Sequence, residues 1–294
     1  MTPRTPALDP RLSGVVAVFY VFLWASAFVP SKIASTESPP LWFLATRFGV
    51  AGALLALAAL ALRRPFPRTG RAWLVAIVLG ILSNALYLGL TYSALGHLAS
   101  GLAAIIASTN PLVLAVVAPR LLREPLNGRK AMGLAFGFGG VLAIVVTRAG
   151  TGTAAPGDVL LAFGGVCASV ASTVLFKRAA TGQDLLSLSA VQMLAASVAL
   201  VPIAWLTGEA PRAHVSAALG ASFAYLVVVL SVGATLIWFW LLGRGEASRV
   251  SAFYYLTPAF GLALSALLLH ERVTPHDLIG LAAIAAGILL VQRS

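Results

Sequence analysis

The sequence predicts an all-α integral membrane protein, in which ten transmembrane helices form two inverted five-helix repeats around a central cavity. Two observations lead to this fold class. The 294-residue chain is 60% hydrophobic and only 10% charged, whereas a soluble domain carries roughly 25% charged residues. Its second half also repeats a set of characteristic residues of its first half, 147 positions further along the chain (position 257 corresponds to position 110). A mean hydropathy of +0.95 agrees with a bilayer environment.

The repeat divides the chain into two domains of equal design, 11–147 and 157–293, joined by a linker at 148–156 that is rich in Gly, Thr and Ala. If each half crosses the bilayer an odd number of times, the second half must be inserted upside down. Many secondary transporters build a midplane substrate site between two such halves. The matched markers are Asn110-Pro111 with Thr257-Pro258, Glu124 with Glu271, Gly133 with Gly280, and Gly140 with Gly287.

Ten apolar runs have about the 17–25 residues that a spanning helix needs. Each half contains five of them. The eighth run is long enough to include a segment that leads into the membrane. The runs are 15–33, 41–62, 72–95, 99–121, 129–147, 159–176, 185–206, 215–243, 250–269 and 278–291.

The first run has two interpretations. Arg4 and Arg11 before it, and Ala25-Ser26-Ala27 after its apolar part, resemble a cleavable signal peptide. A retained first helix is favoured, because run 159–176 is its counterpart in the second half. Cleavage would leave one half a helix short.

The basic residues predict the orientation. Fifteen of the 20 Lys and Arg residues fall in the loops of one side, four fall on the other side, and Arg47 lies inside the second run. Cytoplasmic loops carry the excess of Lys and Arg. Both termini are therefore expected in the cytoplasm.

The third and eighth runs carry polar and aromatic residues at helical spacing. Asn84, Tyr87 and Thr91 share one helix face, as do Ser231, Thr235 and Trp238. The repeat offset superposes Asn84 on Ser231, so two inverted helices present matched faces to a central cavity. Such groups also hold helices together by hydrogen bonds, and that alternative stays open. Trp24 in the first run and its approximate counterpart Ser169 in the sixth complete the predicted ring.

The fourth and ninth runs each contain a proline in mid-span, Pro111 and Pro258. Proline removes a backbone donor, so we expect a kink and a hinge at each position. Asn110, Tyr255 and Thr257 lie beside these prolines and are expected to contact substrate; a purely structural kink is the alternative.

Glycines are expected to form faces for close helix approach in the fifth and tenth runs. Gly133, Gly137 and Gly140 recur at intervals in the fifth run, and Gly280 and Gly287 in the tenth. Contact within one monomer is favoured over a dimer face. Asn127 and Thr274 are expected N-caps of these two helices.

Several kinds of chemistry have no support in the sequence. The single cysteine, Cys167, excludes a multi-cysteine metal site, no nucleotide-binding loop is present, and the net charge of +11 is distributed over the loops, as in membrane proteins rather than nucleic-acid binders. No Asp or Glu lies in the middle of a span to relay protons.

Arg47 is expected to pack between helices or to extend toward the outer surface near Glu37; facing a substrate carboxylate is the alternative.

The residues also carry a family resemblance. The stretch 24–32 (Trp-Ala-Ser-Ala-Phe-Val-Pro-Ser-Lys) resembles the first-helix signature of the drug/metabolite transporter superfamily in its EamA-type, ten-helix branch. Arg47-Phe48 and the stretch from Asn110-Pro111 through Arg123-Glu124 to Gly140, with its copy in the second half, are similar to it too. The resemblance extends over essentially the whole chain. By general character the chain is most similar to bacterial amino-acid exporters, including those for aromatic amino acids.

Together these observations predict an exporter of small metabolites, most readily neutral or aromatic amino acids, that works by alternating access without obligatory proton coupling. The protein is not expected to be an enzyme or to bind a cofactor, a metal or nucleic acid. It is expected to act as a monomer in the lipid bilayer, with a dimer as the alternative. Two competing functions remain. One is a flippase or exporter of a lipid-linked or phosphorylated metabolite, and the other is proton-coupled drug efflux.

Overall fold

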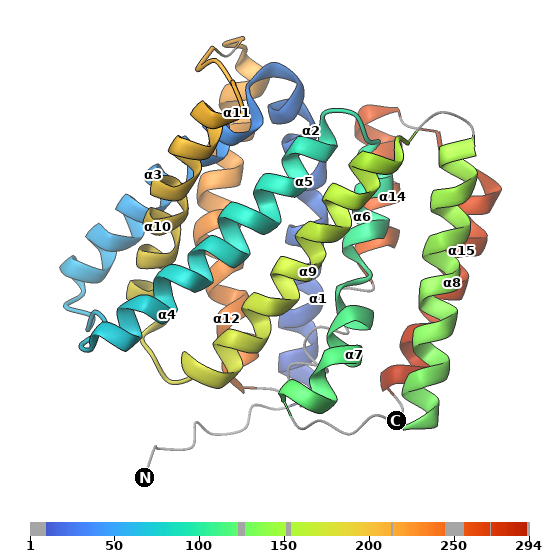
Figure 1. Cartoon of the computed structure of the whole chain (residues 1–294), viewed down its shortest axis with the longest axis horizontal. Coiled ribbons are helices and arrows are strands. Elements are labelled where there is room, and N and C mark those ends of the chain that lie inside the picture. Colours follow the sequence, from blue (N-terminus) through green and yellow to red (C-terminus); the bar gives the residue numbers. More distant parts are fainter. Residues whose placement is uncertain are drawn as a thin grey trace.

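The computed structural model describes residues 10–122, 127–150, 154–212, 214–244, 256–270 and 272–292, and these residues form helices and connecting loops without a strand (Figure 1). The first half contains α1 (Pro10–Ser26), α2 (Phe28–Glu37), α3 (Pro40–Ala61), α4 (Gly70–Gly80), η1 (Ile81–Leu86), α5 (Tyr87–Leu95), α6 (Ser100–Ala107), α7 (Asn110–Leu121) and α8 (Gly128–Gly150). The second half contains α9 (Pro156–Ala179), α10 (Leu185–Leu206), α11 (Ala217–Tyr225), η2 (Leu226–Ala234), α12 (Thr235–Arg244), α14 (Thr257–Leu269) and α15 (Pro275–Gln292).

Seven helical stretches are long and apolar enough to cross a membrane. They correspond to the predicted spans one to four and six to eight. The other three predicted spans also fall on helices, namely α8, α14 and α15. For these three, crossing the bilayer remains a prediction. The seven stretches are Gly14–Glu37, Pro40–Ala61, Gly70–Leu95, Ser100–Leu121, Pro156–Ala179, Leu185–Leu206 and Ala217–Gly243.

The two halves pack as an inverted pair. In Figure 1, α1 runs from the lower end of the molecule to the upper end, whereas its counterpart α9 runs downward. The helix contacts repeat with this symmetry. Counterparts α3 and α10 pack along their length, as do counterparts α8 and α15. The contact of α9 with η1 and α5 likewise has its copy in the contact of α1 and α2 with α11 and η2.

Glycines allow the close approach of α8 and α15. A Cβ atom added to Gly140 would lie 2.7 Å from the carbonyl oxygen of Gly280 and 3.1 Å from the amide nitrogen of Ile284. A Cβ atom on Gly287 would meet the backbone of Gly133 and Gly137 in the same way. The two contacts are copies of each other under the repeat. The predicted glycine faces therefore meet inside one chain.

Two lysines provide a second pair of matched contacts. The Lys32 ammonium donates to the carbonyls of Leu95 at 2.6 Å and Leu98 at 2.8 Å, and Lys177 donates to the carbonyl of Leu242 at 2.8 Å. Each lysine thus binds the C-terminal carbonyls of the third span of its own repeat, where a cation is favourable. Lys177 follows Lys32 by 145 residues (177 minus 32), because the connection after α10 is two residues longer than that after α3.

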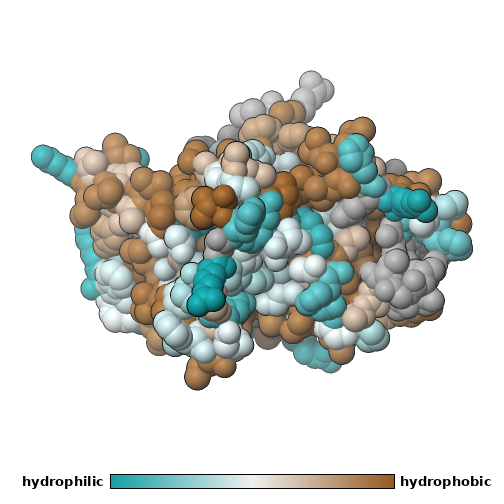
Figure 2. All heavy atoms as spheres, turned by 90° about the horizontal axis from the view of Figure 1, so that it is seen from above, coloured by the Kyte–Doolittle hydropathy of each residue, from teal (hydrophilic) through white to brown (hydrophobic). Residues whose placement is uncertain are grey.

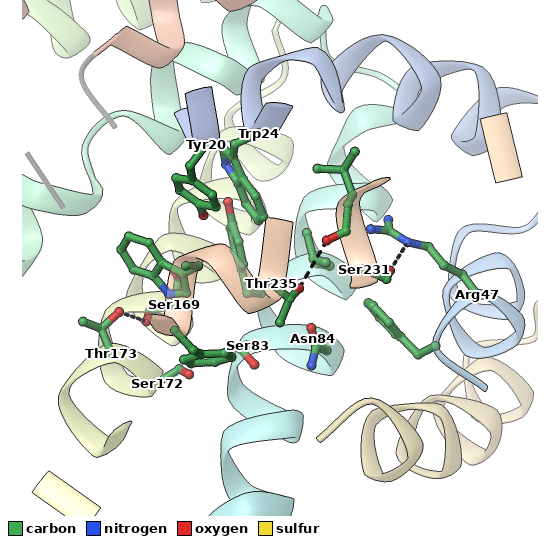
Figure 3. Close-up of a pocket in the computed structure, with 16 residues that line it drawn as sticks. Tyr20, Trp24, Arg47, Ser83, Asn84, Ser169, Ser172, Thr173, Ser231 and Thr235 are labelled. Carbon is green, nitrogen blue, oxygen red and sulfur yellow. Dashed lines mark hydrogen bonds between the residues drawn. The ribbon is translucent and has the colours of Figure 1, made fainter. Parts of the chain in front are cut away.

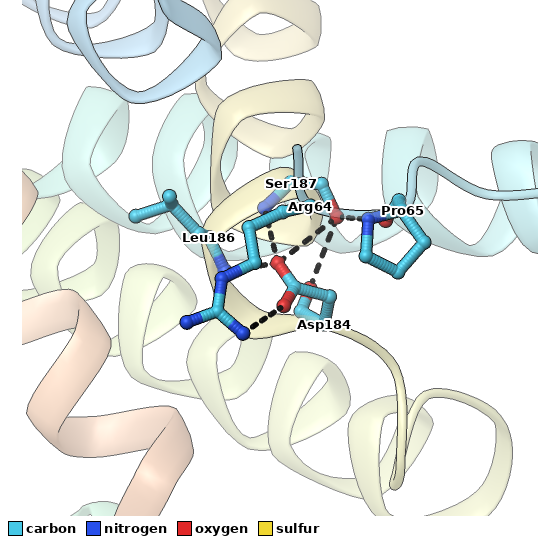
Figure 4. A network of polar contacts seen from close by, with 5 residues as sticks. All are labelled: Arg64, Pro65, Asp184, Leu186 and Ser187. Carbon is cyan, nitrogen blue, oxygen red and sulfur yellow. Dashed lines mark hydrogen bonds and ion pairs between the residues drawn. The ribbon is translucent and has the colours of Figure 1, made fainter. Parts of the chain in front are cut away.

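The pair α3 and α10 is tied at both ends by acidic residues. At the lower end Asp184 accepts bonds from the amides of Leu186 and Ser187, both at 3.1 Å, and lies 3.9 Å from Arg64 (Figure 4). At the upper end Glu209 accepts a bond from the amide of Leu41 at 3.0 Å. Carboxylates at helix N-termini stabilise both helices. Figure 2 views the upper end and shows hydrophilic residues gathered across it beside broad hydrophobic areas.

The predicted kink at Pro111 takes the form of a break. Helix α6 ends at Ala107 and α7 begins at Asn110, with Pro111 in its first turn, where the missing N–H costs nothing. Ser108 and Thr109 return their hydroxyls to the carbonyls of Ile105 and Ile106. Helix α14 likewise begins at Thr257, so Pro258 is its second residue. The structure therefore divides the fourth span rather than bending one continuous helix.

Candidate functional site

A central cavity of about 50 Å³ lies between the two halves (Figure 3). Helices α1, α3, η1 and α5 supply its wall from the first half, and α9, η2 and α12 supply it from the second. A water molecule takes up about 30 Å³ in the liquid, and drug-sized ligands occupy pockets of about 300–1,000 Å³. The cavity must therefore widen before it can hold a metabolite. A smaller cavity of about 30 Å³ shares Trp24, Arg47, Tyr87, Leu88 and Leu230 with it.

Six of the nine predicted substrate contacts line the central cavity. Their side chains come from five separate elements of the two halves. The predicted polar face of the third span and that of the eighth therefore do meet. The six residues are Trp24, Asn84, Tyr87, Ser169, Thr235 and Trp238.

Two π-helical segments bring these faces together. Asn84 lies in η1 and Ser231 in η2, at positions that the repeat superposes. A π-helix leaves the regular α-helical ladder and often occurs at functional sites. Thr235 supports η2, because its hydroxyl donates to the carbonyl of Leu230 at 3.3 Å. The buried amide nitrogen of Asn84 has no hydrogen-bond partner among the described residues.

Aromatic rings form one continuous side of the cavity. Tyr20 stacks on Trp238 with ring centroids 5.3 Å apart and on Trp24 with centroids 6.1 Å apart, and Trp24 stacks on Tyr87 at 6.0 Å. Four rings from α1, α5 and α12 thus make a connected wall (Figure 3). Tyr20 was not predicted to line the cavity. It lies four residues before Trp24 on the same helix face, and this spacing could have identified it.

The rest of the cavity wall is rich in hydroxyl groups. Ser169, Ser172 and Thr173 point into the cavity from α9, and Ser83 joins them from η1 (Figure 3). Ser172 and Thr173 follow Ser169 by three and four residues, the spacing of one helix face. They were not predicted, because hydroxyl residues are frequent along this helix and also serve helix packing.

The described residues beside the two prolines do not line the cavity. Asn110 donates from its amide to the Ser169 hydroxyl at 2.9 Å, so it contacts a lining residue rather than the cavity. Thr257 is fully buried and does not line the cavity. Tyr255 lies outside the described residues. Pro111 and Pro258 occupy equivalent positions at the starts of α7 and α14.

Arg47 faces the cavity from α3. Its Nε donates to the Ser231 hydroxyl and its Nη1 to the Tyr92 hydroxyl, both at 2.9 Å. Of the two expected positions of Arg47, packing between helices is the one observed, and extension toward Glu37 is wrong. The Glu37 carboxylate instead accepts a bond from Ser216. The helix register decides this difference. It turns Arg47 toward the centre of the molecule, where only 4% of its surface is exposed.

Comparison with known proteins agrees with this architecture. The EamA-like transporter family matches the chain twice, over residues 12–146 and 157–293. An uncharacterized transporter, YvbV, of Bacillus subtilis (strain 168) is 30% identical over 285 residues, covering 97% of this chain and 93% of the relative. A probable amino-acid metabolite efflux pump of Escherichia coli (strain K12) is 26% identical over 291 residues, covering 95% and 94%.

A solved crystal structure shares the fold, with a TM-score of 0.71 at 20% identity, and the match covers 95% of this chain and 94% of that one. The relatives are transporters rather than enzymes, and the helices are those of a multi-pass membrane protein. The two family matches leave out little more than the connection between the halves. The chain belongs to the EamA-like transporter family of the drug/metabolite transporter superfamily.

Proposed function

We propose that this protein exports small metabolites, most readily neutral or aromatic amino acids, across the inner membrane of a bacterial cell. The observation that carries the proposal is the central cavity, in which a stack of four aromatic rings faces a wall of amide and hydroxyl groups. Such a site suits a zwitterion with an apolar side chain. Polar groups bind its charged ends, the rings accept the side chain, and a ring face can also attract the ammonium group.

The relation to an amino-acid metabolite efflux pump in Escherichia coli supports this substrate class. Trp24, Asn84, Tyr87, Ser169, Thr235 and Trp238 are proposed to contact the substrate directly. Asn110, Thr257 and Tyr255 are proposed to join the site when the cavity opens, with Pro111 and Pro258 as hinges. We propose a monomer as the working unit, because the α8–α15 glycine faces are used within one chain.

The deciding experiment is flux in proteoliposomes. Purified protein should exchange radiolabelled L-phenylalanine against unlabelled L-phenylalanine, L-leucine and L-tryptophan, and much less against L-glutamate. Exchange of only lipid-linked or phosphorylated compounds would refute the proposal in favour of the flippase alternative.

Transport is expected to run without a proton gradient. None of the residues that line the cavity is an Asp, Glu or His, so the described wall offers no group to relay protons. Phenylalanine efflux from preloaded liposomes should therefore keep the same initial rate when a proton ionophore collapses ΔpH. If the ionophore stops efflux, proton-coupled drug efflux becomes the better description.

The proposed orientation of the protein in the membrane can be tested by cysteine labelling. Both termini and the Arg68 loop should face the cytoplasm, and Arg212 should face outward, since basic residues concentrate on the cytoplasmic side. In a Cys167→Ser background, a membrane-impermeant maleimide added to intact spheroplasts should label Arg212→Cys. It should label Arg68→Cys only after the cells are permeabilised. The reverse pattern would contradict the orientation.

A further inference from the structure

We infer that Arg47 is the recognition group for the carboxylate of the transported compound, which makes the cavity a site for monocarboxylates that carry an apolar or aromatic group. This inference rests on the proposed function, because it concerns the same cavity. Arg47 is a permanent cation that lies deep in the membrane-embedded part of the chain. Arg47 lines both the central cavity and the smaller cavity beside it, so its guanidinium lies where the two meet.

The charge of Arg47 has no counter-ion in the described structure. The chain has nine Asp and Glu residues in all. The five described ones are used elsewhere: Asp184 and Glu209 bind helix N-termini, Glu37 binds Ser216, Asp158 pairs with His97, and Asp277 binds Thr274. The other four belong to segments that the structure does not describe. A buried charge without a partner is strongly unfavourable. The fold retains one here beside the cavity.

Neutral neighbours hold the guanidinium in place. Ser231 and Tyr92 each accept one N–H, Tyr92 is itself bonded to Ser31 at 2.6 Å, and the ring of Phe48 lies 5.4 Å below the guanidinium carbon. Arginine has five N–H donors. Two of them are used, so three remain without a partner among the described residues. Two are on Nη2 and one is on Nη1, which is the fork that binds a carboxylate through two parallel bonds.

The repeat shows that the fold does not require a cation at this position. Helices α3 and α10 begin at Pro40 and Leu185, an offset of 145 residues (185 minus 40), which places Gln192 at the position of Arg47. Gln192 is fully buried and neutral. The same packing environment in the second repeat is thus built around an amide. The charge in the first repeat has a purpose other than packing, and recognition of an anion provides it.

The number of charges favours a carboxylate over a phosphate. Arg47 is the only Lys or Arg among the residues that line either cavity. One guanidinium neutralises one carboxylate, whereas a phosphate monoester carries about −1.5 to −2 at neutral pH. The aromatic stack then lies across the cavity to receive the rest of the molecule. For an amino acid, this places the carboxylate on Arg47 and leaves the ammonium and side chain to the rings and hydroxyls.

Four probes of the same size test the inference in proteoliposomes: L-phenylalanine, L-phenylalaninamide, 3-phenylpropionate and phenyl phosphate. Charge-assisted hydrogen bonds to a buried group support a preference of about 10- to 100-fold. Wild-type flux of the two carboxylates should exceed that of the amide by this factor, and phenyl phosphate should not compete. Equal flux of phenylalanine and its amide, or preferred flux of phenyl phosphate, would overturn the inference.

Variants of Arg47 and Tyr92 test whether the Arg47 guanidinium causes the preference for carboxylates. In Arg47→Gln, which copies the residue of the second repeat, phenylalanine flux should fall to the level of the amide, while amide flux stays within about twofold of wild type. Arg47→Lys should retain part of the preference, since it keeps the charge but not the fork. Tyr92→Phe keeps the cation but removes one of the two hydroxyl groups that hold it. A partial loss of the carboxylate preference is therefore expected in this variant too. An Arg47→Gln protein that keeps the full preference would disprove the assignment.

The fluxes of the four probes distinguish failure of the Arg47 assignment from failure of the proposed function. If wild-type protein moves 3-phenylpropionate but no amino acid, Arg47 recognises carboxylates and the amino-acid proposal fails. If it moves phenylalanine and its amide equally, the amino-acid proposal stands and the Arg47 assignment fails. Should Arg47→Gln not fold, as judged by gel filtration and thermal unfolding, the wild-type probe series and Tyr92→Phe still decide.

Discussion

Replacing Gly140 with alanine should destabilise the protein strongly, although it adds one methyl group. The new Cβ atom would lie 2.7 Å from the Gly280 carbonyl oxygen and 3.1 Å from the Ile284 amide nitrogen, and both are backbone atoms of α15. Neither can move without shifting the helix. Overpacking of this kind costs about 1–3 kcal/mol. Thermal unfolding of the purified protein in detergent, followed by tryptophan fluorescence, should show a clear drop in midpoint.

The neighbouring Gly139 provides a matched control. A Cβ atom added there would meet nothing within 4 Å. Gly139→Ala should therefore leave the unfolding midpoint unchanged or raise it slightly, because alanine favours a helix over glycine by about 1 kcal/mol. Gly287→Ala, the copy in the second repeat, should behave like Gly140→Ala. Equal midpoints for Gly139→Ala and Gly140→Ala would show that α8 and α15 do not approach as closely as described.

Replacing Trp238 with alanine is expected to impair transport more than truncation of any other aromatic residue of the cavity wall. Trp238 stacks on Tyr20 at the end of the aromatic row and faces the polar wall of α9. Aromatic groups at the centre of a binding site typically contribute about 2 kcal/mol or more, which corresponds to roughly 30-fold weaker binding. Exchange of L-phenylalanine in proteoliposomes should fall by about this factor. Trp24→Ala and Asn84→Ala should fall as well, though less steeply.

A tryptophan outside the cavity tests whether this loss is specific. Trp73 in α4 is 41% exposed and belongs to neither of the two central cavities. Trp73→Ala should transport at the wild-type rate, as should Leu57→Ala, whose side chain is 64% exposed on α3. The thermal midpoint of each variant separates a transport defect from a folding defect. Wild-type exchange by a well-folded Trp238→Ala protein would remove it from the proposed site.

Much of the fold could be predicted, because in a bilayer the sequence constraints are severe. Every backbone group must be satisfied within its own helix, so apolar length alone marks a span. Seven of the ten marked runs correspond to stretches that meet this criterion in the structure. The repeat offset also predicted that the faces of Asn84 and of the eighth span meet at a central cavity, whereas the packing of Gly140 against the tenth span is a finding of the structure. The prediction follows from similar residues at matched positions.

The features that sequence could not predict depend on three-dimensional register. Tyr20 shares a helix face with Trp24, but only the structure shows that this face stacks on Trp238 of the other half. The direction of Arg47 depends on how α3 is rotated, and a long side chain can otherwise extend toward the membrane surface. The π-helical turns at Asn84 and Ser231 leave no mark in hydrophobic periodicity over so few residues. Asn110 was predicted as a substrate contact from its neighbour Pro111, but its amide binds Ser169 instead.

The paired π-helical segments imply where a long span can change shape at little energetic cost. Each segment accommodates an extra residue in its hydrogen-bond ladder. If that residue passes to the next turn, an equal number of backbone bonds forms and breaks, while the side chains in between rotate by about 100°. Such a step would swing Asn84 in η1, or Ser231 in η2, away from the cavity and leave both ends of the helix anchored. Because Ser231 supports Arg47, slippage in η2 would also release the guanidinium, joining helix register to ligand release in a single movement.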